Sequence, residues 1–243
     1  MELTPKCNWN CPYCYASYAK DDSLDTQSWK DVMSILSKNG VFQVTFGGGE
    51  PMLRKDLFEL AQYARDSSLT LGMTTNGSLL KDDERLSLFN QINVSYHQHR
   101  EDSTEVLQEG IEKARRYTEC GINFLCRQDN MKNLDTIVDL AKVHDAELLL
   151  LSYKPVNGDI EQFVPRHEIM EIAQGLHESG VRMAIDGFAA SQCEGGYSFV
   201  DVSSTGDIFA CSFHREPVGN ILKEDFQRLW KRVPTLSICP YEP

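Results

Sequence analysis

The chain has 243 residues, 41% of them hydrophobic and 25% charged, which is typical of a globular protein with a sizeable core. Its 36 acidic residues outnumber its 24 Lys and Arg residues, so the formal net charge is −12. This charge argues against an extended phosphate-binding surface and therefore against nucleic acid as a partner. The sequence contains no apolar run of about 18 residues, which is the length that would predict a membrane span. No signal peptide precedes the first cysteines, so we expect a cytoplasmic protein.

Strands and helices alternate along most of the chain. Short β-branched or apolar runs predict strands, and apolar residues at helical spacing predict helices. The expected strands are 1–5, 41–46, 69–75, 92–96, 121–127, 147–153 and 181–185, and the expected helices are 26–38, 56–65, 82–89, 103–118, 133–144 and 165–179. This alternation predicts an α/β fold with a parallel sheet. About six strand–helix units predict a partial (β/α)6 TIM-like barrel, because a closed barrel needs eight.

The last part of the chain has another pattern. Two alternating strands, joined at Gly206, predict a hairpin, and a short helix is expected at about 223–232. We therefore expect two domains, a barrel over residues 1–187 and a small hairpin-plus-helix extension over 188–243.

Cys7, Cys11 and Cys14 lie within eight residues, with the spacing C-x3-C-x2-C. Thiolates this close favour a shared centre of zinc, copper(I) or an iron–sulfur cluster. A structural zinc ion would need a fourth ligand nearby, but the next cysteine is Cys120 and the first histidine is His97. A four-iron cluster normally takes four thiolates, so three leave one iron open to a ligand that is not protein.

This motif, with Tyr13 before its last cysteine, resembles the signature of the radical S-adenosylmethionine (SAM) superfamily. The resemblance implies a (β/α)6 partial barrel with a 4Fe–4S cluster whose open iron binds SAM. It implies that one electron cleaves SAM to a 5′-deoxyadenosyl radical, which removes hydrogen from a substrate C–H bond. Tyr13 would then cover the adenine, unless it is simply a core residue. A flavodoxin- or ferredoxin-type electron donor is implied as well.

A glycine-rich loop, Gly47–Pro51, follows the second expected strand. Consecutive glycines allow positive φ angles and a close approach of backbone to a ligand. The loop resembles the family's GGE motif, which implies that Gly48, Gly49 and Glu50 bind the amino group of SAM. A plain strand-to-helix turn is the alternative.

Other candidate residues lie where expected strands end, which is where ligands gather in parallel α/β folds. The resemblance implies that Thr75 and Asn76 lie beside the cluster, that Ser95 and Arg127 bind the ribose and carboxylate of SAM, and that Leu151 packs on adenine. Each has a structural alternative. Asn76 precedes Gly and favours a turn, Arg127 suits a salt bridge to an acidic surface, and Leu151 lies in an apolar strand.

Three residues are candidates for the reaction itself. His97 and His99 would share one face of a strand end, where they suit acid–base contact with a substrate or stabilisation of the loop. Cys126 alternates with Arg127, so it faces the helix layer if Arg127 points inward. A role as hydrogen donor requires the opposite register, and a core thiol is the alternative.

Cys193, Cys211 and Cys239 belong to the C-terminal extension. The pattern resembles the Twitch or truncated SPASM extension of some radical SAM enzymes, which implies an auxiliary 4Fe–4S cluster. The matching features are Gly206-x4-Cys211, Val218–Ile221 and Trp230.

This extension departs from its pattern at one position, because Glu242 stands where a C-x-x-C pair would place a second cysteine. A carboxylate, His214 or a core cysteine then completes the cluster, or one iron stays open to bind substrate. A zinc site with His214, or no metal role for these cysteines, is the alternative.

The function implied is that of a radical SAM oxidoreductase or maturase. Relatives with this extension often act on ribosomally made peptides, so we favour cross-linking or epimerisation of a peptide. Oxidation or rearrangement of a small metabolite, such as a sugar, aminocyclitol or nucleotide, is the second hypothesis. A non-catalytic iron–sulfur electron carrier is the third, but a carrier has no need for the glycine-rich loop.

Overall fold

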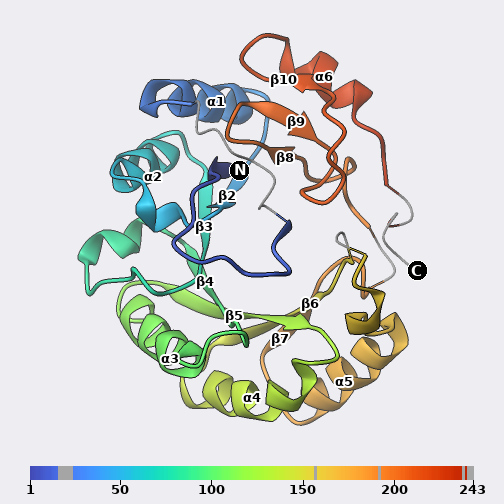
Figure 1. Cartoon of the computed structure of the whole chain (residues 1–243). Coiled ribbons are helices and arrows are strands. Elements are labelled where there is room, and N and C mark those ends of the chain that lie inside the picture. The colour runs from blue at the N-terminus through green and yellow to red at the C-terminus, as the bar shows by residue number, and fades with distance from the viewer. Residues whose placement is uncertain (16–23, 156–157, 191–192, 237–238, 240–243) are drawn as a thin grey trace. The chain divides into compact units, whose positions relative to one another are not determined.

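The computed structural model describes residues 1–15, 24–155, 158–190, 193–236 and 239. Seven strands form one sheet in chain order (Figure 1). They are β1 (Glu2–Thr4), β2 (Gln43–Gly48), β3 (Thr70–Thr75), β4 (Gln91–Ser95), β5 (Glu119–Cys126), β6 (Glu147–Ser152) and β7 (Met183–Ile185). The β1–β2, β2–β3, β5–β6 and β6–β7 pairs are parallel. The predicted α/β fold with a partial TIM-like barrel is confirmed.

Helices lie between the strands in the sequence, at or near the predicted positions. They are α1 (Thr26–Lys38), α2 (Leu57–Asp66), α3 (Ser103–Ala114), α4 (Leu134–Val143) and α5 (Arg166–Glu178). The Asp25 carboxylate caps α1 by accepting a hydrogen bond from the Ser28 amide at 2.7 Å. The helix expected at 82–89 is instead a five-residue 3-10 helix, η3 (Glu84–Leu88). A segment this short forms too few helical hydrogen bonds to offset α-helix nucleation.

The chain divides into two compact units that differ from a simple N- and C-terminal split. Unit 1 contains residues 1–75, 84–91 and 194–236, and unit 2 contains residues 76–83, 92–193 and 237–243. In unit 1, large apolar side chains such as Trp29 and Phe46 are fully buried. In unit 2, Ile122, Phe124 and Leu148 are fully buried too. Each unit therefore has a core of its own.

The C-terminal part of unit 1 contains a three-stranded antiparallel sheet of β8 (Asp201–Val202), β9 (Asp207–Phe209) and β10 (Gly219–Asn220). The predicted hairpin is present, with Gly206 at φ +82° in its turn. The strand β10 was not predicted, because two residues are too few to produce an alternating pattern. The expected helix begins at Phe226 and ends at Arg232 (α6), where the Asp225 carboxylate accepts from the Arg228 amide at 3.0 Å.

A buried ionic group joins β1 to this sheet inside unit 1. The Arg215 guanidinium donates to Glu2 at 3.0 Å, and a second nitrogen lies 3.5 Å from Asp201. Glu2 is 4% exposed and Asp201 is 6% exposed. Burial and the nearby Asp201 carboxylate raise the pKa of Glu2 to about 7, although Arg215 opposes this shift. The two carboxylates therefore share one cation, in a place where charge is costly.

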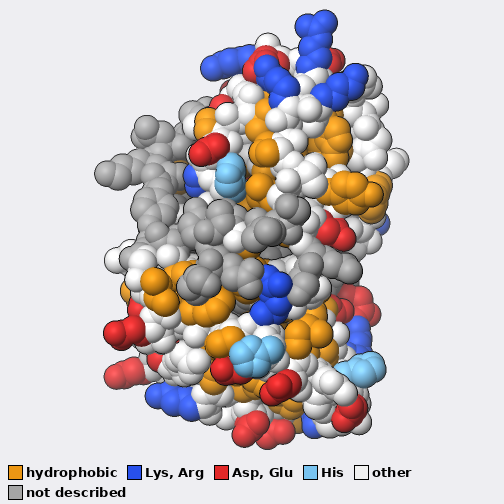
Figure 2. All heavy atoms as spheres, turned by 90° about the vertical axis from the view of Figure 1, so that its right-hand side faces the viewer, with side chains coloured by type: hydrophobic (Ala, Val, Ile, Leu, Met, Phe, Trp, Pro, Cys, Tyr) orange, Lys and Arg blue, Asp and Glu red, His pale blue; other side chains and the backbone are white. Residues whose placement is uncertain are grey.

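The surface around α6 is basic, unlike the chain as a whole. Lys223, Arg228, Lys231 and Arg232 are exposed there, and Arg232 pairs with Glu224 at 2.6 Å. Figure 2 shows Lys and Arg side chains gathered at its upper end, where α6 lies in Figure 1. Within the part of the chain that the structure describes, no helix is long and apolar enough to cross a membrane.

Candidate cofactor site

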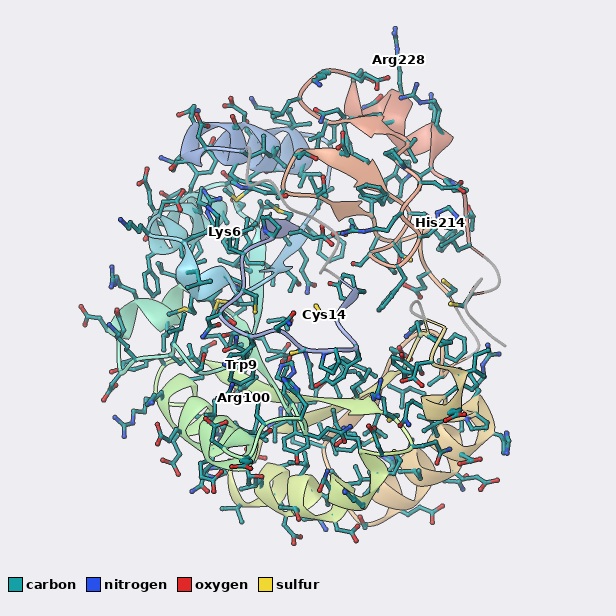
Figure 3. The ribbon with its side chains drawn as sticks, viewed as in Figure 1. Lys6, Trp9, Cys14, Arg100, His214 and Arg228 are labelled. Carbon is teal, nitrogen blue, oxygen red and sulfur yellow. The ribbon has the colours of Figure 1, made fainter. Side chains whose placement is uncertain are left out.

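The cysteine loop leaves unit 1 strand β1 and carries all three N-terminal cysteines. Cys7 is exposed, while Cys11 and Cys14 are half-buried. The Trp9 amide donates to the Cys7 sulfur at 3.4 Å, and the Cys14 amide donates to the Cys11 carbonyl at 3.1 Å. Lys6, Trp9 and Cys14 follow one another along this loop in Figure 3. The backbone thus already provides an N–H···S contact of the kind that tunes thiolate ligands in iron–sulfur sites.

The glycine-rich loop is bonded directly to the base of the cysteine loop. The Gly49 amide donates to the Thr4 carbonyl at 2.7 Å, and the Glu50 amide donates to the Lys6 carbonyl at 2.8 Å. A Cβ atom at Gly49 would lie 2.2 Å from the Lys6 carbonyl oxygen, so no other residue fits. Gly48, at φ +105°, lies in the left-handed region that favours glycine. The two loops are therefore held as one backbone unit.

Glu50 is fully buried behind this loop. One of its carboxylate oxygens accepts from the Met52 amide at 3.0 Å and from the Thr75 hydroxyl at 2.8 Å. The structure thus brings Glu50 and Thr75 together, although 25 residues separate them. A buried carboxylate held in this way is pre-oriented to accept hydrogen bonds from a cation.

The donor set fits an iron–sulfur cluster with SAM on its open iron. Three sulfur atoms come from one loop, the soft ligands that such clusters require. The crowded backbone at Gly49 keeps the neighbouring loop against Lys6, one residue before Cys7. Glu50 adds a buried carboxyl group whose oxygens can accept hydrogen bonds from an ammonium group. Tyr13, expected to cover adenine, is half-buried in the same loop.

In unit 2, the side chains of Asn76 and Ser95 have different surroundings. The Asn76 carbonyl oxygen accepts from the Ser78 amide at 3.0 Å and from its hydroxyl at 2.6 Å, so Asn76 forms the turn that its sequence favours. Ser95 ends β4, and its hydroxyl lies 3.5 Å from the Asn123 amide nitrogen. Asn123 is 6% exposed, and its carbonyl oxygen is buried without a hydrogen-bond partner.

Asn123 was not predicted as a site residue, although the sequence contains a feature that marks it. It is a polar residue inside the otherwise apolar strand β5, and by alternation it shares a face with Arg127. A buried amide oxygen without a partner is costly, which makes Asn123 a candidate ligand contact beside Ser95.

Arg127 is 7% exposed and is held by acidic residues of unit 2. Its guanidinium pairs with Asp129 at 3.1 Å and with Asp159 at 3.5 Å, and it lies 4.6 Å from the centre of the Tyr153 ring. Burial alone would lower the pKa of Arg127, but the hydrogen bonds that its guanidinium donates to Asp129 outweigh burial and raise this pKa. The salt-bridge alternative is therefore present in the structure, and a contact with the SAM carboxylate stays a prediction.

His97 and His99 lie next to each other, with ring centres 6.0 Å apart in an edge-on arrangement. Burial, followed by the positive charges of His99 and Arg100, lowers the pKa of His97 to about 4. Burial and Arg100 lower the pKa of His99 as well. Both rings are therefore neutral at pH 7, where they act as hydrogen-bond partners or bases and not as acids.

Cys126 and Leu151 occupy different environments. Cys126 is fully buried, and burial together with Asp186 raises the pKa of its thiol to about 12. The thiol is thus protonated and enclosed, as expected for the helix-facing position opposite Arg127. Leu151 is half-buried, whereas its neighbour Leu150 is fully buried.

Near the C-terminus, Cys211 lies in a tight turn with His214. The His214 amide donates to the Cys211 carbonyl at 3.1 Å and to its sulfur at 3.3 Å. Gly195 lies against the same turn, because a Cβ atom there would be 3.4 Å from the Cys211 Cβ. The Leu236 amide donates to the Gly195 carbonyl at 2.9 Å. Glu242, which stands in the position of a further cysteine, lies outside the described residues.

An aromatic contact links the cysteine loop to the Cys211 turn inside unit 1. The rings of Tyr15 and Phe213 have centres 4.7 Å apart. Tyr15 follows Cys14 directly, and Phe213 is two residues after Cys211. Burial and the carboxylates of Asp201 and Glu2 raise the pKa of Tyr15, so its hydroxyl stays protonated. The spacing of residues along the sequence does not predict this long-range contact.

Residues 1–141, more than half of the chain, match the family described as the radical SAM superfamily. The chain belongs to the radical SAM superfamily. This match covers the cysteine loop, the glycine-rich loop and the sheet as far as β5.

The similarity of this radical SAM chain to its relatives extends over its C-terminal part as well. It is 25% identical to the mycofactocin maturase MftC of Mycolicibacterium smegmatis, over 95% of this chain and 69% of the relative. It is 26% identical to a PqqA peptide cyclase of Xanthomonas euvesicatoria, over 87% of this chain and 66% of the relative. The chain thus spans about two thirds of the length of these relatives.

Solved structures share the fold. SuiB of Streptococcus suis, bound to its precursor peptide SuiA, superposes with a TM-score of 0.77 at 16% identity, over 94% of this chain and 63% of SuiB. The enzyme anSMEcpe, with bound AdoMet and a peptide, gives a TM-score of 0.74 at 17% identity, over 95% of this chain and 78% of anSMEcpe. This chain therefore shares its fold with two proteins whose solved structures contain a bound peptide.

Proposed function

We propose that this chain modifies a peptide by radical SAM chemistry, with Cys7, Cys11 and Cys14 as the cluster ligands. The observation that carries the proposal is the bonding of the glycine-rich loop to the base of the cysteine loop, through the Glu50 and Gly49 amides. When bound, the cluster and SAM supply a 5′-deoxyadenosyl radical that removes hydrogen from a substrate C–H bond. The protein contributes binding, orientation and exclusion of water.

The roles proposed for the chain's own residues come from the resemblance to the family, and the contacts of the described residues support them. Glu50, buried and anchored by Thr75, accepts a hydrogen bond from the amino group of SAM. Gly48 and Gly49 let the backbone approach the same group. Ser95, supported by Asn123, holds the ribose, and Leu151 packs on adenine. By the resemblance to the family, Tyr13 covers adenine.

A peptide is favoured as the substrate because of which relatives cover the chain. A mycofactocin maturase and a PqqA peptide cyclase match 95% and 87% of it, so the likeness includes the C-terminal part. A probable GTP 3′,8-cyclase of Methanococcus vannielii matches 66% of the chain at 28% identity. That match supports the second candidate function, the rearrangement of a small metabolite.

An auxiliary 4Fe–4S cluster at Cys193, Cys211 and Cys239 is part of the proposal. Gly195, two residues after Cys193, lies against Cys211, and Leu236, three residues before Cys239, is hydrogen-bonded to Gly195. Cys193 and Cys239 are thus two and three residues away from segments that contact the Cys211 turn or each other, which supports the proposal. Such a cluster would accept an electron from the product radical or hold the substrate.

Reduction of the cluster requires an external donor of the flavodoxin or ferredoxin type. The exposed basic surface of α6, with Lys223, Arg228 and Lys231, supports binding of an acidic donor. This contact predicts that reduction by a protein donor slows as the salt concentration rises.

Anaerobic reconstitution tests the proposal. We expect about eight iron atoms per chain, and formation of 5′-deoxyadenosine from SAM after reduction. Incubation with peptides encoded beside the gene should give a product whose mass reports the bond formed. If reduced, iron-loaded protein produces no 5′-deoxyadenosine, the enzymatic proposal is wrong. If small metabolites are converted and peptides are not, the second candidate function holds.

A further inference from the structure

We propose that His214 is a ligand of the auxiliary metal centre and binds it through Nδ1. This inference rests on the proposed auxiliary cluster and names the ligand that its three cysteines leave open. It is carried by three features of the segment Cys211–His214: its backbone turn, the contact with the Cys211 sulfur and the His214 ring.

The first observation is the shape of the turn. The His214 amide donates to the Cys211 carbonyl at 3.1 Å, which closes a turn of four residues. The first and last Cα atoms of such a turn lie within about 7 Å of each other. Metal-binding knuckles use the same spacing of two intervening residues, because it lets both side chains reach one centre.

The second observation is the hydrogen bond to the Cys211 sulfur. The same His214 amide lies 3.3 Å from this sulfur, so the backbone already contacts the thiol. Cys7 in the N-terminal loop has a matching contact, from the Trp9 amide at 3.4 Å. Cys211 is therefore arranged like a cysteine of the proposed SAM cluster, and not like Cys120, whose thiol is buried in a core.

The third observation is the His214 ring itself. Its Nδ1 atom is buried and has no hydrogen-bond partner. Its Nε2 atom lies 3.9 Å from the carboxylate of Glu216. Metal-bound histidines commonly donate one ring N–H to a carboxylate, which leaves the lone pair of the other nitrogen for the metal. The contact with Glu216 is longer than a hydrogen bond, so the buried Nδ1 atom is the ring nitrogen that the protein leaves for a metal.

A buried imidazole nitrogen without a partner is costly in an ordinary protein interior. Coordination of a metal removes that cost, and it explains why a chain with Glu242 in the usual cysteine position can still complete its centre. Figure 3 shows His214 on the segment that follows β9.

The test uses a background in which only the auxiliary centre can form. The variant with Cys7→Ala, Cys11→Ala and Cys14→Ala is reconstituted anaerobically with iron and sulfide, from protein in which only histidine carries ¹⁵N. Electron–nuclear double resonance on the reduced cluster then detects a histidine nitrogen bound to iron. We expect this coupling in the background variant and its loss on His214→Ala.

Three further variants separate ligation from folding. His144→Ala, at the C-terminal end of α4 and half-buried like His214, is the matched histidine control and should keep the coupling. His214→Cys should restore a full cluster without nitrogen coupling and with a lower reduction potential, because thiolate replaces imidazole. Glu216→Gln should keep the coupling, because the exposed Glu216 carboxylate lies 3.9 Å from Nε2 and is not proposed as a ligand.

Two results would overturn the inference in distinguishable ways. A cluster that forms in the background variant without histidine coupling, or with coupling that survives His214→Ala, refutes His214 as the ligand and leaves the auxiliary cluster standing. Background protein that takes up no iron, while the unmodified chain takes up about four atoms, refutes the auxiliary cluster itself.

Discussion

Replacement of Gly49 by alanine should separate the two loops that form the proposed SAM site. The added Cβ atom would meet the Lys6 carbonyl oxygen at 2.2 Å, where about 3.2 Å is the closest ordinary approach, so the backbones must move apart by about 1 Å. This movement disrupts the hydrogen bonds from Gly49 to Thr4 and from Glu50 to Lys6. Each contributes about 0.5–1.5 kcal/mol, and overpacking adds about 1–3 kcal/mol.

We therefore expect Gly49→Ala to lower the free energy of unfolding by about 2–6 kcal/mol, measured by urea denaturation of the iron-free protein. The matched control is Gly47→Ala, because a Cβ atom at Gly47 has no neighbour within 4 Å and the residue lies in the same loop. That control should change the free energy by less than about 1 kcal/mol. Equal effects of the two substitutions would refute the argument that the close approach at Lys6 holds the loops together.

Other substitutions test the charges of the site and of the core. Glu50→Gln should weaken SAM binding to the reconstituted protein by about 10–100-fold, because a charge-assisted hydrogen bond becomes a neutral one. The control Glu59→Gln, at an exposed position, should leave SAM affinity unchanged. If Glu50→Gln also leaves the affinity unchanged, Glu50 is not part of the SAM site. The pKa of Glu2 is raised to about 7 in the folded state, so between about pH 4.5 and pH 7 the carboxylate binds a proton on folding. This proton binding stabilises the folded state, and the stabilisation is lost as the pH rises through 7. Glu2→Gln should therefore flatten the fall in unfolding free energy between pH 5 and pH 8, by on the order of 2–3 kcal/mol. A variant with the same slope as the parent would show that Glu2 titrates normally. Arg215→Met should destabilise the chain by about 2–4 kcal/mol at pH 8, where both carboxylates lose their shared cation, and a smaller loss in a Glu2→Gln background would confirm the coupling.

Local features of the sequence were sufficient for the barrel and for the N-terminal loop. The alternation of short apolar runs with helical spacing identified the strands and helices of the sheet, because each signal is complete within about ten residues. The spacing of Cys7, Cys11 and Cys14 and the Gly47–Pro51 loop identified the family in the same way. Errors fell on short elements, such as η3 and β10, where too few residues carry a pattern.

The environment of individual candidate residues could not be read in this way. The sequence allowed either a SAM contact or a salt bridge for Arg127, and its pairing with Asp129 and Asp159 depends on how a loop returns to the end of β5. Cys126 was open to two orientations, and its full burial follows from the register of β5 against β6, where it pairs with Ser152. Asn123 was not predicted as a site residue, because it lies in an otherwise apolar strand.

The sequence by itself thus determined the fold class, the cysteine ligands to test and the radical SAM family, because these depend on residue types at short, fixed spacing. Only the tertiary structure decided which distant residues meet. Arg215 bonds to Glu2 across 213 positions of the chain, and the Lys6 carbonyl leaves no room for a side chain at Gly49. Such contacts arise when packing brings separate segments together, and no local pattern in either segment specifies its partner.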